Sequence, residues 1–142
     1  MVRTLWVRWI SAFAILVALP GCRGNDQSTV SASGTVQVEG QDVSGLVITL
    51  QPIAPTTGPK ATVPVFGGEF TIGPEAGLHG GQYRVRFSVM PAEILSQLPE
   101  DKRIGLVPAG QFVTRAFDVD SQLKWRLDRG EANENNFDVE LE

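Results

Sequence analysis

Apolar and polar residues alternate along most of the chain after residue 32. The clearest stretch is 82–89, where Tyr83, Val85, Phe87 and Val89 alternate with polar or charged residues. Because successive side chains of a β-strand point to opposite faces, this alternation predicts a strand with one buried face. Further segments with the same period lie at 35–39, 46–51, 61–65, 70–72, 123–127 and 136–141.

Glycine and proline residues mark the ends of the predicted strands. Gly67-Gly68 predicts a hairpin turn into the strand at 70–72. Pro64 predicts that segment 61–65 is an edge strand, because proline has no N–H to give to a neighbouring strand.

Residues 91–111 interrupt the alternation. Within them, Ile94, Leu95 and Leu98 are spaced as on a helix and lie between two prolines, which predicts one or two helical turns. We expect this apolar stripe to cover one open end of the fold, or else to dock a partner.

The six or seven short strands, each with one apolar face, predict an all-β fold. The expected form is a two-sheet antiparallel sandwich of about seven strands, Ig-like or transthyretin-like. The polar faces argue against a parallel sheet, whose strands are apolar on both sides. Residues 113–119 fit either an additional strand or an extended crossing. We expect this domain to occupy residues 32–142.

The N-terminus follows a different pattern. Arg3 and Arg8 are followed by an apolar run that extends to Leu19, which is the form of a secretory signal helix. The run from Trp9 has 11 residues, whereas about 20 are needed to cross a bilayer. The sequence Leu19-Pro20-Gly21-Cys22 resembles the lipobox of bacterial lipoproteins, with Pro20 where Ala, Ser or Thr is usual.

The lipobox resemblance implies that residues 1–21 are a signal peptide and that Cys22 becomes an acylated N-terminus. In similar lipoproteins, a residue other than Asp after the cysteine directs the protein to the bacterial outer membrane, and Arg23 meets this condition. Residues 22–31 are small and polar, which predicts a flexible tether. The alternative is an ordinary secretory signal cut nearby, with Cys22 unmodified.

Net charge restricts the kinds of partner to expect, and cysteine content restricts how the domain is stabilised. Without residues 1–21 the chain has ten basic and sixteen acidic side chains, a net charge of −6. Nucleic acids and anionic lipids attract proteins with a positive field, so the acidic balance argues against both. The single cysteine excludes an internal disulfide, so stability has to come from packing.

Four motifs with glycine or aromatic residues follow one another in the predicted strands. They are Ser33-Gly34-Thr35-Val36, Val43-Ser44-Gly45-Leu46-Val47-Ile48, Gly68-Glu69-Phe70-Thr71-Ile72 and Gly81-Gln82-Tyr83-Arg84-Val85. In this order they resemble the carboxypeptidase regulatory-like, or transthyretin-like, domain over about residues 32–142. The resemblance implies a β-sandwich that acts as a non-catalytic accessory or adhesion-like module, with no shared ligand.

Enzyme chemistry finds little support in the chain. His79 is the only histidine, and no second histidine or free cysteine is present to build a zinc site, so a solvated turn histidine is the simpler interpretation. The transthyretin relatives that hydrolyse 5-hydroxyisourate use several histidines and end in a Tyr-Arg-Gly-Ser-like tail, and this chain has neither. We expect no enzymatic activity, no catalytic residue and no cofactor.

Acidic residues near the C-terminus are candidates for a metal site. Asp118, Asp120 and Asp128 are weak calcium candidates, because calcium prefers carboxylate and carbonyl oxygens in loops. Their spacing does not fit an EF-hand loop. The alternative is an outward polar face followed by a charged turn.

Basic residues are candidates for a second kind of site. Arg84 and Arg86 share one face of a predicted strand, and Lys124 and Arg126 can lie opposite them as a cationic patch for an anionic polymer. The interpretation that the sequence favours is cross-strand pairing with Asp or Glu. Trp125 alternates with core positions, so we expect it to be buried rather than to stack on a sugar.

Together these patterns favour a non-enzymatic, lipid-anchored protein of the bacterial cell envelope, on the periplasmic or outer side of the outer membrane. We expect a structural or binding module that contacts an unidentified envelope protein or a polysaccharide through a surface loop such as 91–111. The alternative is a small-ligand or calcium-binding periplasmic domain with a loop site near Asp118 to Asp128. The membrane is a partner through Cys22, and nucleic acid is not expected.

Overall fold

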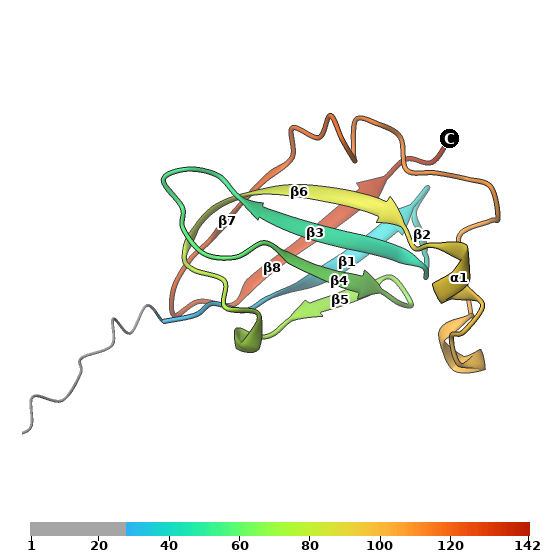
Figure 1. Ribbon diagram of the computed structural model, residues 1–142, viewed down its shortest axis with the longest axis horizontal. Coiled ribbons are helices and arrows are strands. Elements are labelled where there is room, and N and C mark those ends of the chain that lie inside the picture. The colour runs from blue at the N-terminus through green and yellow to red at the C-terminus, as the bar shows by residue number, and fades with distance from the viewer. Residues whose placement is uncertain (1–27) are drawn as a thin grey trace, which may run out of the picture.

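Two four-stranded β-sheets face each other in the computed structural model, which describes residues 28–142 (Figure 1). The all-β sandwich predicted from the alternation is confirmed. The expected signal helix, the cleavage point before Cys22 and most of the predicted tether lie outside the described residues.

The first sheet contains β1 (Ala32–Val38), β2 (Gln41–Asp42), β5 (Glu69–Ile72) and β8 (Asn133–Val139). β1 is its central strand, pairing antiparallel with β2 and β5 and parallel with β8. The parallel register runs from Ala32 opposite Asn133 to Val38 opposite Val139.

This parallel pair is an exception to the antiparallel pairing that was expected and that the other strand pairs follow. Among the strands of the described residues, β8 pairs only with β1, and it lies at the edge of its sheet with one face in solvent. Glu134 and Asp138 are accordingly exposed, while Val139 is buried. A half-exposed strand alternates in the same way whichever direction it runs, so the pattern predicts the buried face but not the direction.

The second sheet contains, in spatial order, β4 (Ala61–Val65), β3 (Leu46–Pro52), β6 (Gly81–Val89) and β7 (Lys124–Leu127). All of its pairings are antiparallel. β4 lies at the edge, which confirms the prediction made from Pro64. Residues 113–119 form no full strand. Val113 makes one antiparallel bridge with Leu141, and residues 115–119 are turns that run beside β6, where the N–H of Phe87 donates to the carbonyl oxygen of Phe117 at 2.9 Å.

The predicted tight turn at Gly67-Gly68 is present, but it joins the two sheets instead of two paired strands. Phe66 and Glu69 exchange backbone hydrogen bonds of 3.0 and 3.1 Å across it, and the two glycines have φ values of 58° and 74°. Beyond the turn, β4 pairs with β3 and β5 pairs with β1. Val65 and Phe70, on either side of the turn, are both buried, so the two strands contribute to the core from different sheets.

The space between the sheets is filled by the inward residues of the strands. Tyr83, Val85 and Phe87 of β6 are buried, as the alternation predicts. Trp125 is 7% exposed, which confirms that it is a core residue. Four aromatic rings form a cluster with centroids 5.3 to 6.3 Å apart, a spacing at which aromatic pairs attract. They belong to Phe70, Phe87, Trp125 and Phe137.

Tyr83 fastens the start of β6 to the loop before it. Its hydroxyl donates to the carbonyl oxygen of His79 at 2.8 Å and accepts the N–H of His79 at 3.0 Å. The arrangement is similar to the tyrosine corner of Ig-like sandwiches. Burial raises the pKa of the Tyr83 phenol above its ordinary value of 10.0, and the hydrogen bond with His79 opposes this increase.

Replacing Tyr83 with phenylalanine is expected to lower the free energy of unfolding by about 1–3 kcal/mol, because both backbone groups of His79 lose their partner. Urea unfolding at neutral pH measures this difference. The raised pKa adds a pH dependence: the wild type is stabilised below pH 10 and loses stability as pH rises through the folded-state pKa.

Tyr83 is the only tyrosine of the chain, so tyrosinate absorbance follows this residue alone. We expect the absorbance to appear above its ordinary pH range and together with unfolding. Equal stability of the two proteins, or a normal titration in the folded state, would show that the buried hydroxyl does not hold this corner.

Candidate functional site

The end of the sandwich opposite residue 28 carries most of the irregular structure. β1 runs away from residue 28, and its turn to β2 lies at the far end (Figure 1). Segment 90–112 and the C-terminus lie at that end too, where Phe112 and Glu142 exchange backbone hydrogen bonds of 2.8 and 2.9 Å. We call residues 39–44, 90–112 and 140–142 the distal end.

Backbone hydrogen bonds hold segment 90–112 against the sandwich. The N–H of Met90 donates to the carbonyl oxygen of Gly45 at 2.8 Å. Ser44 donates to Gly105 at 2.8 Å and accepts from Val107 at 3.0 Å. A loop with its backbone groups satisfied in this way can present side chains in fixed positions.

The predicted helical turns in this segment are confirmed as α1 (Ala92–Leu95), which is followed by the 3-10 turn η2 (Glu100–Lys102). Leu95 and Leu106 lie against Gly45, where an added Cβ would meet each of them at 3.1 Å. Ile94, in contrast, is 50% exposed. The apolar stripe therefore covers part of the sandwich end and presents the rest to solvent.

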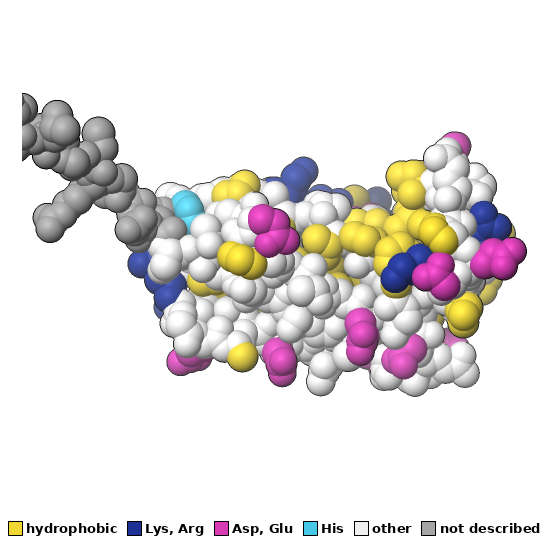
Figure 2. Space-filling model, turned by 90° about the horizontal axis from the view of Figure 1, so that it is seen from below, with side chains coloured by type: hydrophobic (Ala, Val, Ile, Leu, Met, Phe, Trp, Pro, Cys, Tyr) yellow, Lys and Arg dark blue, Asp and Glu magenta, His cyan; other side chains and the backbone are white. Residues whose placement is uncertain are grey.

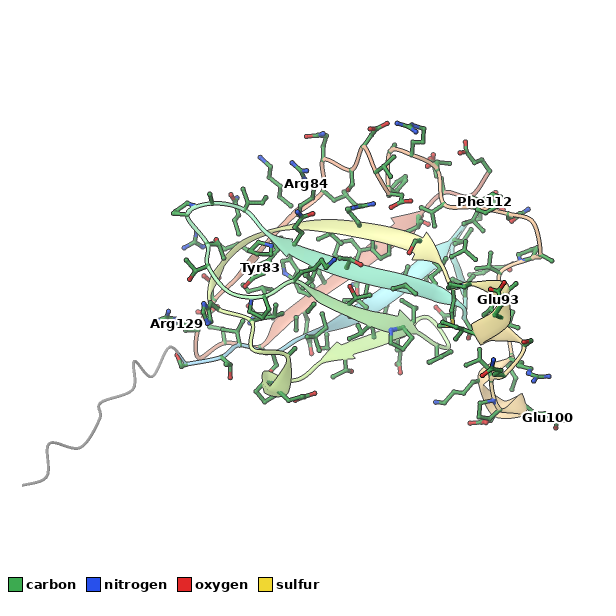
Figure 3. The ribbon with its side chains drawn as sticks, viewed as in Figure 1. Tyr83, Arg84, Glu93, Glu100, Phe112 and Arg129 are labelled. Atoms are coloured by element: carbon green, nitrogen blue, oxygen red, sulfur yellow. The ribbon has the colours of Figure 1, made fainter. Side chains whose placement is uncertain are left out.

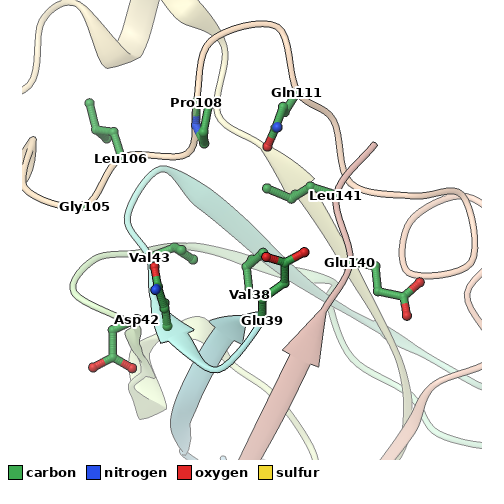
Figure 4. Close-up of a pocket in the computed structure, with 11 residues that line it drawn as sticks. Val38, Glu39, Asp42, Val43, Gly105, Leu106, Pro108, Gln111, Glu140 and Leu141 are labelled. Atoms are coloured by element: carbon green, nitrogen blue, oxygen red, sulfur yellow. The ribbon is translucent and has the colours of Figure 1, made fainter.

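A groove of about 650 Å³ opens at the distal end, and we call it the distal groove (Figure 4). Three segments far apart in the sequence build it, at 38–43, 105–111 and 140–141. Its large apolar side chains are those of Val38, Val43, Leu106 and Leu141.

Acidic side chains stand around these apolar residues. Glu39, Asp42 and Glu140 line the groove, and none of its lining residues in the described chain is Lys or Arg. Glu39 has a φ of 51°, in the left-handed region, within the two-residue turn between β1 and β2. Asn, Asp and Gly are the usual residues at such a position, so the glutamate is strained where it faces the groove.

Large exposed apolar side chains also gather at the distal end. Ile104 is 75% exposed and Phe112 is 66% exposed, and both flank the segment that builds the groove. Figure 2 shows hydrophobic side chains concentrated on the half of the molecule nearer α1, with charged side chains beside them. Apolar side chains that cluster beside a cavity are typical of a contact surface for a partner.

The three aspartates named as calcium candidates each bind a different arginine. Asp118 pairs with Arg86 at 2.9 Å and Asp120 pairs with Arg115 at 2.9 Å. Asp128 pairs with Arg126 at 3.2 Å. Between residues 28 and 142, no three side chains of His, Cys, Asp or Glu come together as a metal site requires. The three ion pairs agree with the alternative interpretation of these aspartates, an outward polar face followed by a charged turn.

The basic candidates divide into two kinds. Arg86 and Arg126 each pair with an aspartate, but not across two strands as expected: Asp118 lies in the turns beside β6, and Asp128 follows Arg126 by two residues. Arg84 and Lys124 lie directly opposite each other in the β6–β7 register, and the part of the chain that the structure describes offers neither of them an ion pair.

His79 lies at the end of the sandwich where residue 28 is found. Its Nδ1 is 3.1 Å from the hydroxyl of Thr57, and its backbone groups bind Tyr83. The histidine is thus placed in a structural contact, away from the distal groove.

Neither a scan against protein-family models nor a search of curated proteins found a match to this chain. In the portion from residue 28 onwards, the helices lack the length and apolar character that a bilayer crossing requires.

Proposed function

We propose that this protein is a non-enzymatic, lipid-anchored binding module of the bacterial cell envelope, which holds a segment of a protein partner in the distal groove. The observation that supports this function is the placement of the groove. The chain reaches the sandwich from residue 28 at one end, while the groove and the exposed Ile104 and Phe112 lie at the other. An anchor at Cys22 leaves the distal end as the part farthest along the domain from the membrane attachment.

The proposed lipid anchor is supported by the N-terminal sequence. The basic start, the short apolar run and the lipobox-like ending at Cys22 support export and acylation, and Arg23 supports the outer membrane as the destination. A single acyl chain binds a membrane only marginally, so stable anchoring needs the multiple acylation typical of lipoproteins. The resemblance to the carboxypeptidase regulatory-like domain agrees with a non-catalytic module.

The chemistry of the groove indicates the kind of partner segment. Its apolar floor suits aliphatic or aromatic side chains, and the carboxylates of Glu39, Asp42 and Glu140 suit Lys or Arg beside them. Ile104 and Phe112 extend the apolar contact beyond the groove. An extended segment with apolar anchors and flanking basic residues fits this surface.

Mass spectrometry of the protein extracted from membranes tests the anchor. We expect the mature chain to begin at Cys22 with its N-terminus and thiol acylated. A chain that begins at Met1, or one with an unmodified Cys22, would contradict the proposal.

A double variant of the groove tests the binding surface. Glu39→Asn with Glu140→Gln removes two carboxylates, and asparagine is better suited than glutamate to the positive φ at residue 39. We expect recovery of a basic partner from detergent-extracted membranes to fall about tenfold, while the unfolding midpoint stays the same or rises.

The matched control is Glu134→Gln with Asp138→Asn, which removes two exposed carboxylates of β8 that do not line the groove. This variant is expected to recover the partner as the wild type does. Equal losses in both double variants would indicate a response to net charge alone, and the proposed role of the groove would be wrong.

A further inference from the structure

The outer face of the second sheet is basic although the domain is acidic. Residues 28–142 contain nine basic and fifteen acidic side chains. The inward residues of β6 and β7 are buried in the core, so the residues that alternate with them point outward. Figure 3 shows Arg84 on this outer side of β6. Five of the nine basic side chains belong to this face, and we call them the basic face: Lys60, Arg84, Arg86, Lys124 and Arg126.

Two of these cations occupy directly opposite positions on neighbouring strands. Arg84 of β6 lies directly opposite Lys124 of β7, and both side chains are exposed. Like charges directly opposite on neighbouring strands are destabilising. Folding alone would favour a carboxylate at one of the two positions, so this arrangement is better explained by an anion that binds between them.

A shallow cavity of about 380 Å³ lies on the same face. Lys60 and Arg86 line it together with the polar side chains of Thr49, Gln51 and Ser88. Asp118 also lines it, bound to Arg86 at 2.9 Å. Gln51 lies opposite Arg84, so the cavity is next to Arg84 and Lys124.

The groups on this face are those that recognise an acidic sugar. Hydroxyl and amide side chains exchange hydrogen bonds with sugar hydroxyls, and Lys and Arg bind carboxylate or phosphate. The face crosses four strands, a width of about 14 Å, which suits an extended polymer better than a single small anion. Its outward residues include no aromatic ring of the kind on which single-stranded nucleic acids stack.

We infer that the basic face binds an anionic polysaccharide, one with carboxylate or phosphate groups along its chain. The face and the distal groove share no lining residue, so this inference does not depend on the proposed protein partner. Binding is electrostatic in large part and is expected to weaken as salt is added.

Titration of the whole mature chain, residues 22–142, carrying Cys22→Ser so that it bears no acyl group, with alginate, a polymer of uronic acids, tests this inference. Dextran is the neutral control, and vesicles of phosphatidylglycerol test an anionic lipid surface. We expect alginate binding that weakens at least tenfold between low salt and about 0.5 M salt. Dextran and the vesicles are expected not to bind. Absence of alginate binding at low salt, equal binding of dextran, or binding of the vesicles alone would overturn the inference.

A pair of double variants with the same change in charge locates the site. Arg84→Gln with Lys124→Gln is expected to weaken alginate binding at least tenfold, with an unfolding midpoint that is unchanged or higher because a like-charge pair is removed. Lys102→Gln with Arg115→Gln, two basic residues outside the basic face, is expected to weaken it less than threefold. Equal losses in the two variants would show that the binding is not specific to this face.

Discussion

Replacing Gly34 with alanine is expected to abolish cooperative folding of the domain. Gly34 lies in the middle of β1, where it is paired with Phe70 of β5 on one side and Asn135 of β8 on the other. A Cβ at this position would overlap the carbonyl oxygen of Asn135 and lie 3.1 Å from the Phe70 ring. The atoms of Asn135 are main-chain atoms, so the overlap is relieved only if β1 and β8 move apart.

The cost of this substitution is expected to be about 4 kcal/mol or more, which is in the exceptional range for a single substitution and comparable with the stability of a small domain. Urea unfolding followed by the fluorescence of Trp125 measures it. Ser33→Ala, at the neighbouring position of β1, adds no atom and serves as the control. An alanine variant that unfolds as the wild type does would show that β1 and β8 are not packed as closely as described.

Truncating Phe87 to alanine is expected to lower the free energy of unfolding by about 3–5 kcal/mol. Phe87 is 1% exposed, and its ring centroid lies 5.3 Å from that of Phe137 on the opposite sheet. The substitution removes a large ring from the contact between the two sheets and leaves a cavity that neighbouring strands cannot fill without shifting.

Phe112 provides the control for the same chemical change. Its ring is 66% exposed at the distal end, so Phe112→Ala is expected to change stability by less than about 0.5 kcal/mol. Thermal and urea unfolding of both variants give the comparison. Similar losses in the two variants would contradict the assignment of Phe87 to the core and Phe112 to the surface.

The sequence predicted which face of each strand is buried, because a strand buried on one side alternates between apolar and polar residues. Tyr83, Val85 and Phe87 alternate with outward residues for this reason. It could not predict the direction of β8, since an edge strand alternates in the same way when it runs parallel. Gly67-Gly68 predicted a tight turn correctly, but a turn signal does not say which sheets the two strands join.

The candidate site was less accessible from sequence. Residues 91–111 were predicted as a contact loop, and the structure places 105–111 in the distal groove. The other groove residues, at 38–43 and 140–141, come from segments about a hundred residues apart that only the β1–β8 pairing brings together. One local feature could have drawn attention to the groove. Glu39 stands before Gly40 in a turn with positive φ, where a glutamate is unusual.

The ion pairing of the basic residues could be predicted from the sequence only in part. Alternation placed Arg84 and Lys124 on outward faces, and the expectation was that acidic residues would pair with the cations. Arg86 and Arg126 do pair with acidic residues, Asp118 and Asp128, but these lie in a turn and two residues along the chain instead of on a neighbouring strand. Strand register and the path of loop 113–123 decide which basic side chains have a carboxylate beside them. Neither can be predicted from a local sequence pattern.

Site-specific cross-linking in intact envelopes tests most directly whether the distal end is the binding end. A photo-reactive residue replaces Ile104, beside the distal groove, or Thr71, which is exposed on the outer face of the first sheet. We predict one protein adduct of defined mass from position 104, none from position 71, and loss of that adduct when Glu39→Asn and Glu140→Gln are added. Equal adducts from both positions, or none from position 104, would contradict the account.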